Sequence, residues 1–289
     1  MWILFALTAS MLFGTRAVLY QWMSQRNMNR NLMLCGVFST GFVAGIAGMI
    51  VLGQGWSSWA QVLVGISLGV GSYSANASLY KGFAVGKAAV VSVLSGLPPL
   101  FVVLVAFLAW GEALNPAQLF GFCIIFAGIL LIRYSNEISF ANLQGAHWGL
   151  LAAAFFTFTD LMAKQSTRLD MEMFSTLTLM FGSGSLLFAL SWLRNRSKTN
   201  LGDSTPCWSQ RKTFFGGMAV GVTNVAGVAA MLVAFSSGGP TGLVSAIAAM
   251  NVMVVLLYSR LVLKDVFRRV EIIGISAALA GIVILRVVQ

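Results

Sequence analysis

The sequence predicts an all-α integral membrane protein with ten transmembrane helices in two inverted five-helix repeats. Three observations support this fold class: a composition too apolar for a water-facing surface, ten apolar runs of membrane-spanning length, and an internal similarity between the two halves. Together they divide the chain into a first repeat at residues 1–137 and a second, inverted repeat at residues 146–289.

The composition indicates a bilayer environment. Of the 289 residues, 58% are hydrophobic and only 9% are charged, with a mean hydropathy of +0.86. Charged residues make up about a quarter of an ordinary soluble domain. The net charge of +10 does not indicate a nucleic-acid partner, because the basic residues lie in short links and form no continuous face. The expected partners are the lipid bilayer, a small-molecule substrate and protons, with the chain a monomer or homodimer.

Ten segments have the length of about 20 apolar residues that a bilayer-spanning helix needs. Uninterrupted runs of this length indicate helices, because every backbone group in lipid must be hydrogen-bonded within the protein. The links between them are too short to hold a soluble domain. The predicted spans are residues 2–22, 31–53, 58–80, 87–109, 115–134, 146–166, 173–193, 213–235, 241–262 and 270–288.

Basic residues are distributed unevenly between the two sides of this predicted bundle. Fourteen follow the odd-numbered spans, whereas three, Lys164, Arg168 and Arg286, lie on the opposite side. Arg133 is counted among the fourteen as a loop residue. Cytoplasmic loops carry an excess of basic residues, so the odd-numbered loops are expected in the cytoplasm and both termini outside. The expected location is a bacterial-type inner membrane.

Residues 83–133 align without gaps with residues 236–286, an offset of 153 positions. Apolar composition alone produces some matches, but an aligned acidic residue and glycines at fixed spacing favour a true repeat. The aligned pairs include Gly86 with Gly239, Ser92 with Ser245, Glu112 with Asp265, Gly121 with Gly274, and Arg133 with Arg286. Five spans per repeat is an odd number, so the second copy must insert upside down. Inverted repeats are typical of secondary transporters with a site near the midplane.

Three short motifs in the first repeat have a distinctive spacing. Span one reads LFGT, span four places Pro99 some dozen residues before Gly111 and Glu112, and span five opens with QLFG. These motifs resemble the Trp-Gly-Ser, the Pro with Gly-Glu, and the Gln-x-x-Gly of the EamA-type branch of the drug/metabolite transporter superfamily. The second repeat departs from the pattern, with LKDV in place of Gly-Glu. The resemblance implies a ten-helix carrier that exports or exchanges amino acids, amines or drugs.

Polar side chains on the inner faces of spans three and eight are candidates for substrate binding. Ser72 and Asn76 share one face of span three with two glycines, and Asn224 has the corresponding place in span eight. Buried asparagines need partners, so Asn76 and Asn224 either line a cavity or hydrogen-bond between helices. Tyr73 and Phe156 are candidates for an aromatic wall.

Span four carries Ser92, Ser95 and Pro99 on one stripe, and its GLPPL sequence removes two backbone donors in mid-membrane. The carbonyl groups left without donors either line a transport cavity or mark a packing kink. Asn251 is the polar residue at the inverted position in span nine. Glu112 and Asp265, at the ends of their spans, are expected to be structural caps.

Asp160 and Arg16 are charged residues inside predicted spans, where a charge costs roughly a few to more than ten kcal/mol. Three interpretations of Asp160 are open: an i,i+4 pair with Lys164, a pair with Arg16, or separate lining of the path by Asp160 and Arg16. Helix geometry places the Cα atoms of Asp160 and Arg16 about 12 Å apart in depth, which disfavours the direct pair. In a cavity, Asp160 would bind a substrate ammonium or carry the coupling proton, and Arg16 would hold a carboxylate.

The expected function is secondary transport of a small metabolite, such as an amino acid, an amine or a drug-like compound, by alternating access; the alternative is a channel or facilitative pore without ion coupling. A channel requires a continuous polar ring, and the sequence has isolated polar positions. No catalytic constellation, such as H-E-x-x-H or paired intramembrane aspartates, supports an enzyme. No metal or cofactor is expected, since there is one histidine and Cys35, Cys123 and Cys207 are far apart.

Overall fold

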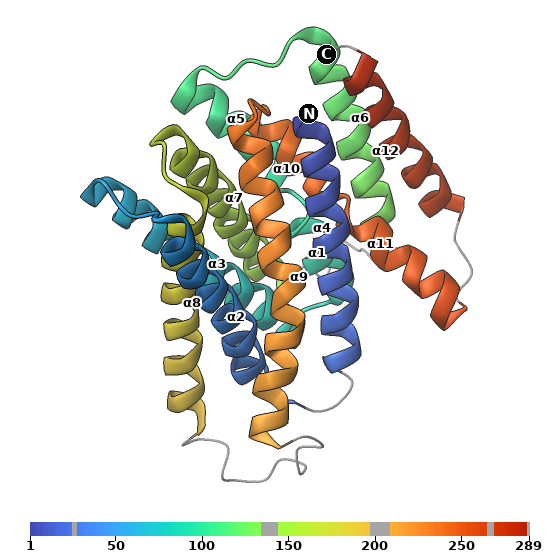
Figure 1. The fold of residues 1–289 in the computed structure, drawn as a ribbon. Coiled ribbons are helices and arrows are strands. Elements are labelled where there is room, and N and C mark those ends of the chain that lie inside the picture. Colours follow the sequence, from blue (N-terminus) through green and yellow to red (C-terminus); the bar gives the residue numbers. More distant parts are fainter. Residues whose placement is uncertain (25–27, 134–143, 197–208, 265–268, 288–289) are drawn as a thin grey trace.

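The computed structural model describes residues 1–24, 28–133, 144–196, 209–264 and 269–287, and long helices dominate these ranges (Figure 1). The helices are α1 (Trp2–Ser24), α2 (Arg30–Leu52), α3 (Trp59–Val85), α4 (Ala88–Leu94), α5 (Pro98–Trp110), α6 (Pro116–Arg133), α7 (Ala146–Arg168), α8 (Met173–Arg196), α9 (Gln210–Ser236), α10 (Thr241–Ala249), α11 (Asn251–Tyr258), the π-helical turn η1 (Ser259–Leu263) and α12 (Arg269–Val287).

Within the described ranges, nine helical segments are long and apolar enough to cross a membrane. The remaining predicted span, residues 146–166, corresponds to α7, whose 23 residues include Asp160, Lys164 and Arg168. It packs inside the bundle against α3, α4, α5 and α9. Both chain termini lie at the same end of the bundle, as an even number of crossings requires (Figure 1). The predicted all-α membrane fold is confirmed.

The two halves repeat the same order of helices at the predicted offset. Helices α4, α5 and α6 begin at residues 88, 98 and 116, and α10, α11 and α12 begin 153 positions later, at 241, 251 and 269. The fourth span is broken in both halves, between α4 and α5 and between α10 and α11. Pro98 and Pro99 occupy the first turn of α5, where a helix does not need their missing N–H groups.

Glycine contacts between α6 and α12 show that the halves are related by inversion. The helices lie side by side, and a Cβ atom added at Gly128 would lie 2.6 Å from the carbonyl oxygen of Gly274. One added at Gly121 would lie 3.3 Å from the carbonyl oxygen of Gly281, so the helices run antiparallel. Gly121 and Gly128 correspond to Gly274 and Gly281 at the offset of 153. Exchanging the halves therefore maps one contact onto the other, which is the property of a two-fold axis.

The first helix of each half packs beside the broken helix of the other half. Helix α1 contacts α9, α10 and α11, while α7 contacts α3, α4 and α5. Small residues allow the close approach: a Cβ atom at Gly14 of α1 would lie 2.4 Å from the Cβ of Val254 in α11. This interleaving brings side chains of both halves around one central region.

Candidate functional site

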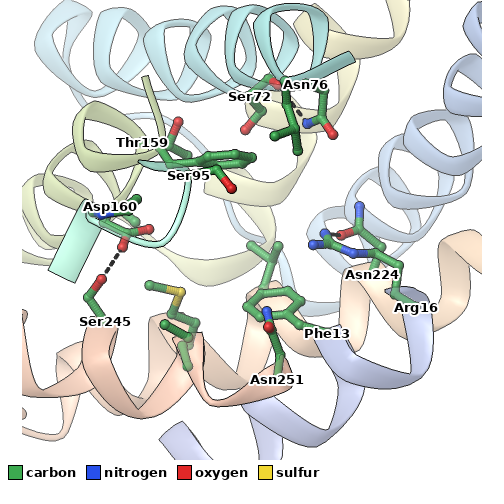
Figure 2. Close-up of a pocket in the computed structure, with 18 of the residues that line it drawn as sticks. Phe13, Arg16, Ser72, Asn76, Ser95, Thr159, Asp160, Asn224, Ser245 and Asn251 are labelled. Atoms are coloured by element: carbon green, nitrogen blue, oxygen red, sulfur yellow. Dashed lines mark hydrogen bonds between the residues drawn. The ribbon is translucent and has the colours of Figure 1, made fainter. Parts of the chain in front are cut away.

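A cavity of about 290 Å³ lies between the two halves, and residues from both line it (Figure 2). Nine of the eleven candidate binding residues are in its lining. They are Arg16, Ser72, Asn76, Ser95, Pro99, Phe156, Asp160, Asn224 and Asn251. The structure therefore brings most of the polar positions selected from the sequence into one place, while their role in binding stays a prediction.

Arg16 projects from α1 into the cavity. Its guanidinium donates a hydrogen bond to Oδ1 of Asn224 on α9, and its Cζ lies 4.7 Å from the centre of the Phe13 ring (Figure 2). The Nε atom of Arg16 is buried and has no hydrogen-bond partner in the described part of the chain. Asn224, which is buried, both lines the cavity and joins two helices, so the two interpretations of this residue hold together.

Asp160 lines the cavity from α7. Its carboxylate accepts a hydrogen bond from the hydroxyl group of Ser245 on α10. Lys164, one turn further along, instead donates to the backbone oxygens of Phe235 at 3.2 Å, in the last turn of α9, and of Gly239 at 3.1 Å, just beyond it. The carboxylate and the ammonium have different partners, so the interpretation of Asp160 and Lys164 as a local pair is wrong.

Arg16 and Asp160 occupy corresponding positions of the two halves. Each is the fifteenth residue of a 23-residue helix, α1 for Arg16 and α7 for Asp160. They lie on opposite sides of the cavity in Figure 2, each hydrogen-bonded to a neutral partner. This is the third arrangement expected from the sequence, in which the two charges line the cavity separately.

The break between α4 and α5 holds a second guanidinium group against the cavity. Arg133, the last residue of α6, donates to the carbonyl oxygen of Ser92 at 2.8 Å and to the hydroxyl oxygen of Ser95 at 3.2 Å. Gly96 leaves room for this side chain, since a Cβ atom there would lie 2.8 Å from Cδ of Arg133. The interpretation of Arg133 as a loop residue is therefore wrong, because it belongs to a helix and lines the cavity.

Two candidate residues do not line the cavity. The Tyr73 hydroxyl shares a hydrogen bond with Ser191 of α8, and its ring packs edge-on against Phe188 with centroids 4.9 Å apart. Successive helix residues point about 100° apart, which is why Ser72 faces the cavity and Tyr73 does not. Ser92 contributes its carbonyl group to Arg133, and it is Ser95 that reaches the lining.

Several lining residues were not selected as binding candidates from the sequence. Of these residues, Ser245 could most easily have been predicted, because the repeat aligns it with the candidate Ser92. Apart from Arg133, the others are apolar or weakly polar side chains whose inward orientation depends on helix packing. They include Phe13, Tyr20, Phe38, Leu68, Thr159, Met180, Val228, Met231 and Ala249.

Other predicted groups are structural or lie elsewhere. The carboxylate of Glu112 accepts from the backbone N–H of Thr241 at 3.1 Å, capping α10 of the opposite half, so its predicted role as a cap is confirmed. Asp265 and Cys207 lie outside the described residues. Cys35 is buried, Cys123 is exposed, and both are free thiols. Within the described residues, no three His, Cys, Asp or Glu side chains form a group that could hold a metal ion.

The fold and its central cavity define a multi-pass helical membrane protein built from two inverted repeats. A family model described as "EamA-like transporter family" matches twice, over residues 1–134 and 143–287. The chain therefore belongs to the EamA-like transporter family, and the resemblance seen in its motifs is confirmed. Membership makes it a transporter of the drug/metabolite type. The exact limits of the two units, at residues 137 and 146, stay a prediction.

A solved structure shares this fold over nearly its whole length. It is described only as "Crystal structure of protein", covers 99% of this chain and 98% of its own, and superposes with a TM-score of 0.78. Its sequence is 17% identical, so the likeness concerns the fold alone. No curated protein matches this sequence.

Proposed function

We propose that this chain is a secondary transporter that exports or exchanges a small zwitterionic metabolite, such as an amino acid, by alternating access. The observation that carries the proposal is the presence of opposite charges at corresponding positions of the two halves, in one cavity. The Arg16 guanidinium suits a substrate carboxylate, and the Asp160 carboxylate suits a substrate ammonium, because charge-assisted hydrogen bonds are the strong ones.

The size and lining of the cavity support a metabolite rather than a larger drug. Its volume of about 290 Å³ lies just below the range of roughly 300–1,000 Å³ for small-molecule sites. Phe13, Phe156 and Met231 give it apolar wall for the uncharged part of a substrate. The broken helices on either side of it suit a mechanism in which the two halves rock around a fixed site.

Asp160 is the proposed coupling residue. A carboxylate that binds a substrate ammonium cannot hold a proton at the same time, because both neutralise the same charge. Competition between the two at Asp160 would exchange substrate for a proton across the membrane. The Ser245 hydroxyl stabilises the ionised form by donating to it.

Counterflow in proteoliposomes tests this function. Vesicles holding the purified protein are loaded with one unlabelled amino acid, and uptake of the labelled compound is followed over time. A carrier gives a transient accumulation above equilibrium, whereas the alternative, a pore, gives simple equilibration. At substrate concentrations high enough to offset weaker binding, the Asp160→Asn variant should keep exchange of substrate for substrate and lose its pH dependence. Absence of accumulation for a panel of amino acids, amines, nucleosides and sugars would argue against the carrier.

A further inference from the structure

The charges around the cavity are unbalanced. Among the described lining residues, Arg16 and Arg133 are positive and Asp160 is negative. A third guanidinium, that of Arg30 at the start of α2, lies 3.4 Å from the carbonyl oxygen of the lining residue Asn76. A substrate with one positive and one negative group would balance only Arg16 and Asp160. One positive charge in the lining itself would then stay without a counter-charge.

The partners of these arginines in the described chain are uncharged. Arg16 donates to the Asn224 amide, and Arg133 to a carbonyl and a hydroxyl oxygen. Arg30 lies over the Tyr80 ring, with 4.1 Å between its Cζ and the ring centre. Neutral oxygens and ring faces satisfy hydrogen bonds without cancelling a charge. A guanidinium whose partners are all neutral keeps its charge and can receive an anion that approaches it.

Arg133 is placed to receive such an anion. It lines the same cavity as Arg16 and Asp160, and its Nε atom is buried without a partner among the described residues. The hydroxyl group of Ser95 lies beside it and projects into the cavity (Figure 2). At the corresponding position of the other half, Arg286 is exposed on α12 and is not in the lining. The second guanidinium is thus a property of one half only.

We propose that Arg133 binds a second carboxylate of the substrate, so that the transported metabolite is an aminodicarboxylate with a net negative charge. Its ammonium binds at Asp160, and its two carboxylates bind at Arg16 and Arg133. Guanidinium groups recognise carboxylates through paired N–H donors, which makes arginine suited to this role. This inference rests on the proposed transport function and adds the charge class of the substrate.

The test compares amino acids that differ in one charge at almost constant size. Counterflow in proteoliposomes is measured for labelled aspartate and asparagine, and for glutamate and glutamine, over a range of concentrations. We expect the half-saturating concentration to be about tenfold or more lower for the anionic member of each pair, as for a lost hydrogen bond to a charged group.

Three variants assign this preference to its residue. Arg133→Gln should bring the ratio within each pair close to one while counterflow of asparagine persists, which shows that the variant is folded. Arg133→Lys keeps the charge without the paired donors and should retain part of the ratio. Arg286→Gln, the matched control from the other half, should leave the ratio unchanged.

The results separate this inference from the function on which it rests. Counterflow of asparagine and glutamine equal to that of their anionic partners would overturn the role of Arg133 and leave the transporter proposal intact. An anionic preference that survives in Arg133→Gln would also overturn it. Simple equilibration of all four compounds and of the wider panel would overturn both proposals.

Discussion

The two broken helices of this chain occupy the same place in their halves and differ in chemistry. The first break, around Gly96, is followed by two prolines and brings Arg133 to the cavity. The second, at Met250, contains no proline, and Ser245 in the helix before it donates a hydrogen bond to Asp160 of α7. The first half therefore places the positive charge of Arg133 at its broken helix, whereas the second half places the negative charge of Asp160 against its own.

This difference shows what duplication and divergence each contribute. Duplication supplies two equivalent frames around one cavity, as the shared helix starts and the glycine contacts demonstrate. A cavity with identical halves would present the same groups on both sides, and a zwitterion has two different ends. Divergence at Arg16 and Asp160, which are equivalent positions, gives the cavity a positive and a negative side.

Removing the charge at each of these equivalent positions should give the largest effects. We expect Arg16→Gln to weaken binding of a transported amino acid about 10- to 100-fold and to spare the matching amine without a carboxylate. Asp160→Asn should weaken the amino acid similarly and spare the matching carboxylic acid without an ammonium. Half-saturating concentrations in counterflow measure both. Equal loss for all compounds in both variants would contradict the division of roles.

The glycine contact between α6 and α12 gives the next largest effect. Gly128→Ala and Gly281→Ala, which correspond at the offset of 153, each place a Cβ atom 2.6 to 2.9 Å from a carbonyl oxygen of the other helix. Overpacking of this kind costs about 1–3 kcal/mol, so both variants should melt at lower temperature in detergent, and by similar amounts. Gly55→Ala is the control, because a Cβ atom there meets nothing within 4 Å. A much larger fall in melting temperature for one variant than for the other would contradict the two-fold relation.

Lys164 of α7 and Tyr20 of α1 are each the nineteenth residue of their helix, and of the two only Tyr20 lines the cavity. Lys164 joins α7 to the end of α9 through two carbonyl groups. Lys164→Met keeps the length of the side chain and removes both bonds, at an expected cost of about 1–2 kcal/mol. Tyr20→Phe keeps the ring beside Arg16 and should change stability by less than about 0.5 kcal/mol. Thermal unfolding in detergent checks both, and equal changes would contradict the assignment.

The smallest predicted effect is the difference between substitutions of the aligned serines Ser245 and Ser92. Ser245→Ala removes the hydroxyl donor to Asp160, and we expect binding to weaken severalfold, as for one hydrogen bond of about 1 kcal/mol. Ser92→Ala retains the carbonyl oxygen that Arg133 uses, so transport should stay within error of the unchanged protein. Half-saturating concentrations in counterflow, measured for both variants in parallel, test this difference. A larger effect at Ser92 would reverse the comparison.

The fold could be predicted from the sequence because the apolar runs recur at regular intervals and the two halves repeat the same pattern. The apolar runs determine the spans, and the offset of 153 survives in the helix starts. Pro98 and Pro99 predicted the first break by removing donors. The second break could not be predicted in this way, because Met250 and Asn251 are ordinary helix residues; the two helices that meet there, α10 and α11, both pack against α1.

The cavity was predictable in part for a related reason. Asn76, Asp160 and Arg16 are costly in lipid wherever they sit, so their residue type alone indicates an inner position. The hydrogen-bond partners of these side chains could not be predicted from the sequence. Asp160 and Lys164 are within reach of each other on one helix, yet their acceptor and donor groups come from α9 and α10, more than 70 positions away. Arg133 stands at the end of an apolar run, where a loop residue and a lining residue look alike.

The contact between α6 and α12 also bears on how this chain originated. A contact in which one surface meets its own equivalent is isologous, the kind that joins two copies of one protein in a symmetric dimer. A five-helix unit with Gly121 and Gly128 on its last helix therefore carries a surface able to pair with a second copy inserted in the opposite sense. The present chain has the geometry of two such half-length ancestors joined end to end. In one continuous chain, each half can differ on its own side of the cavity without a change in the other.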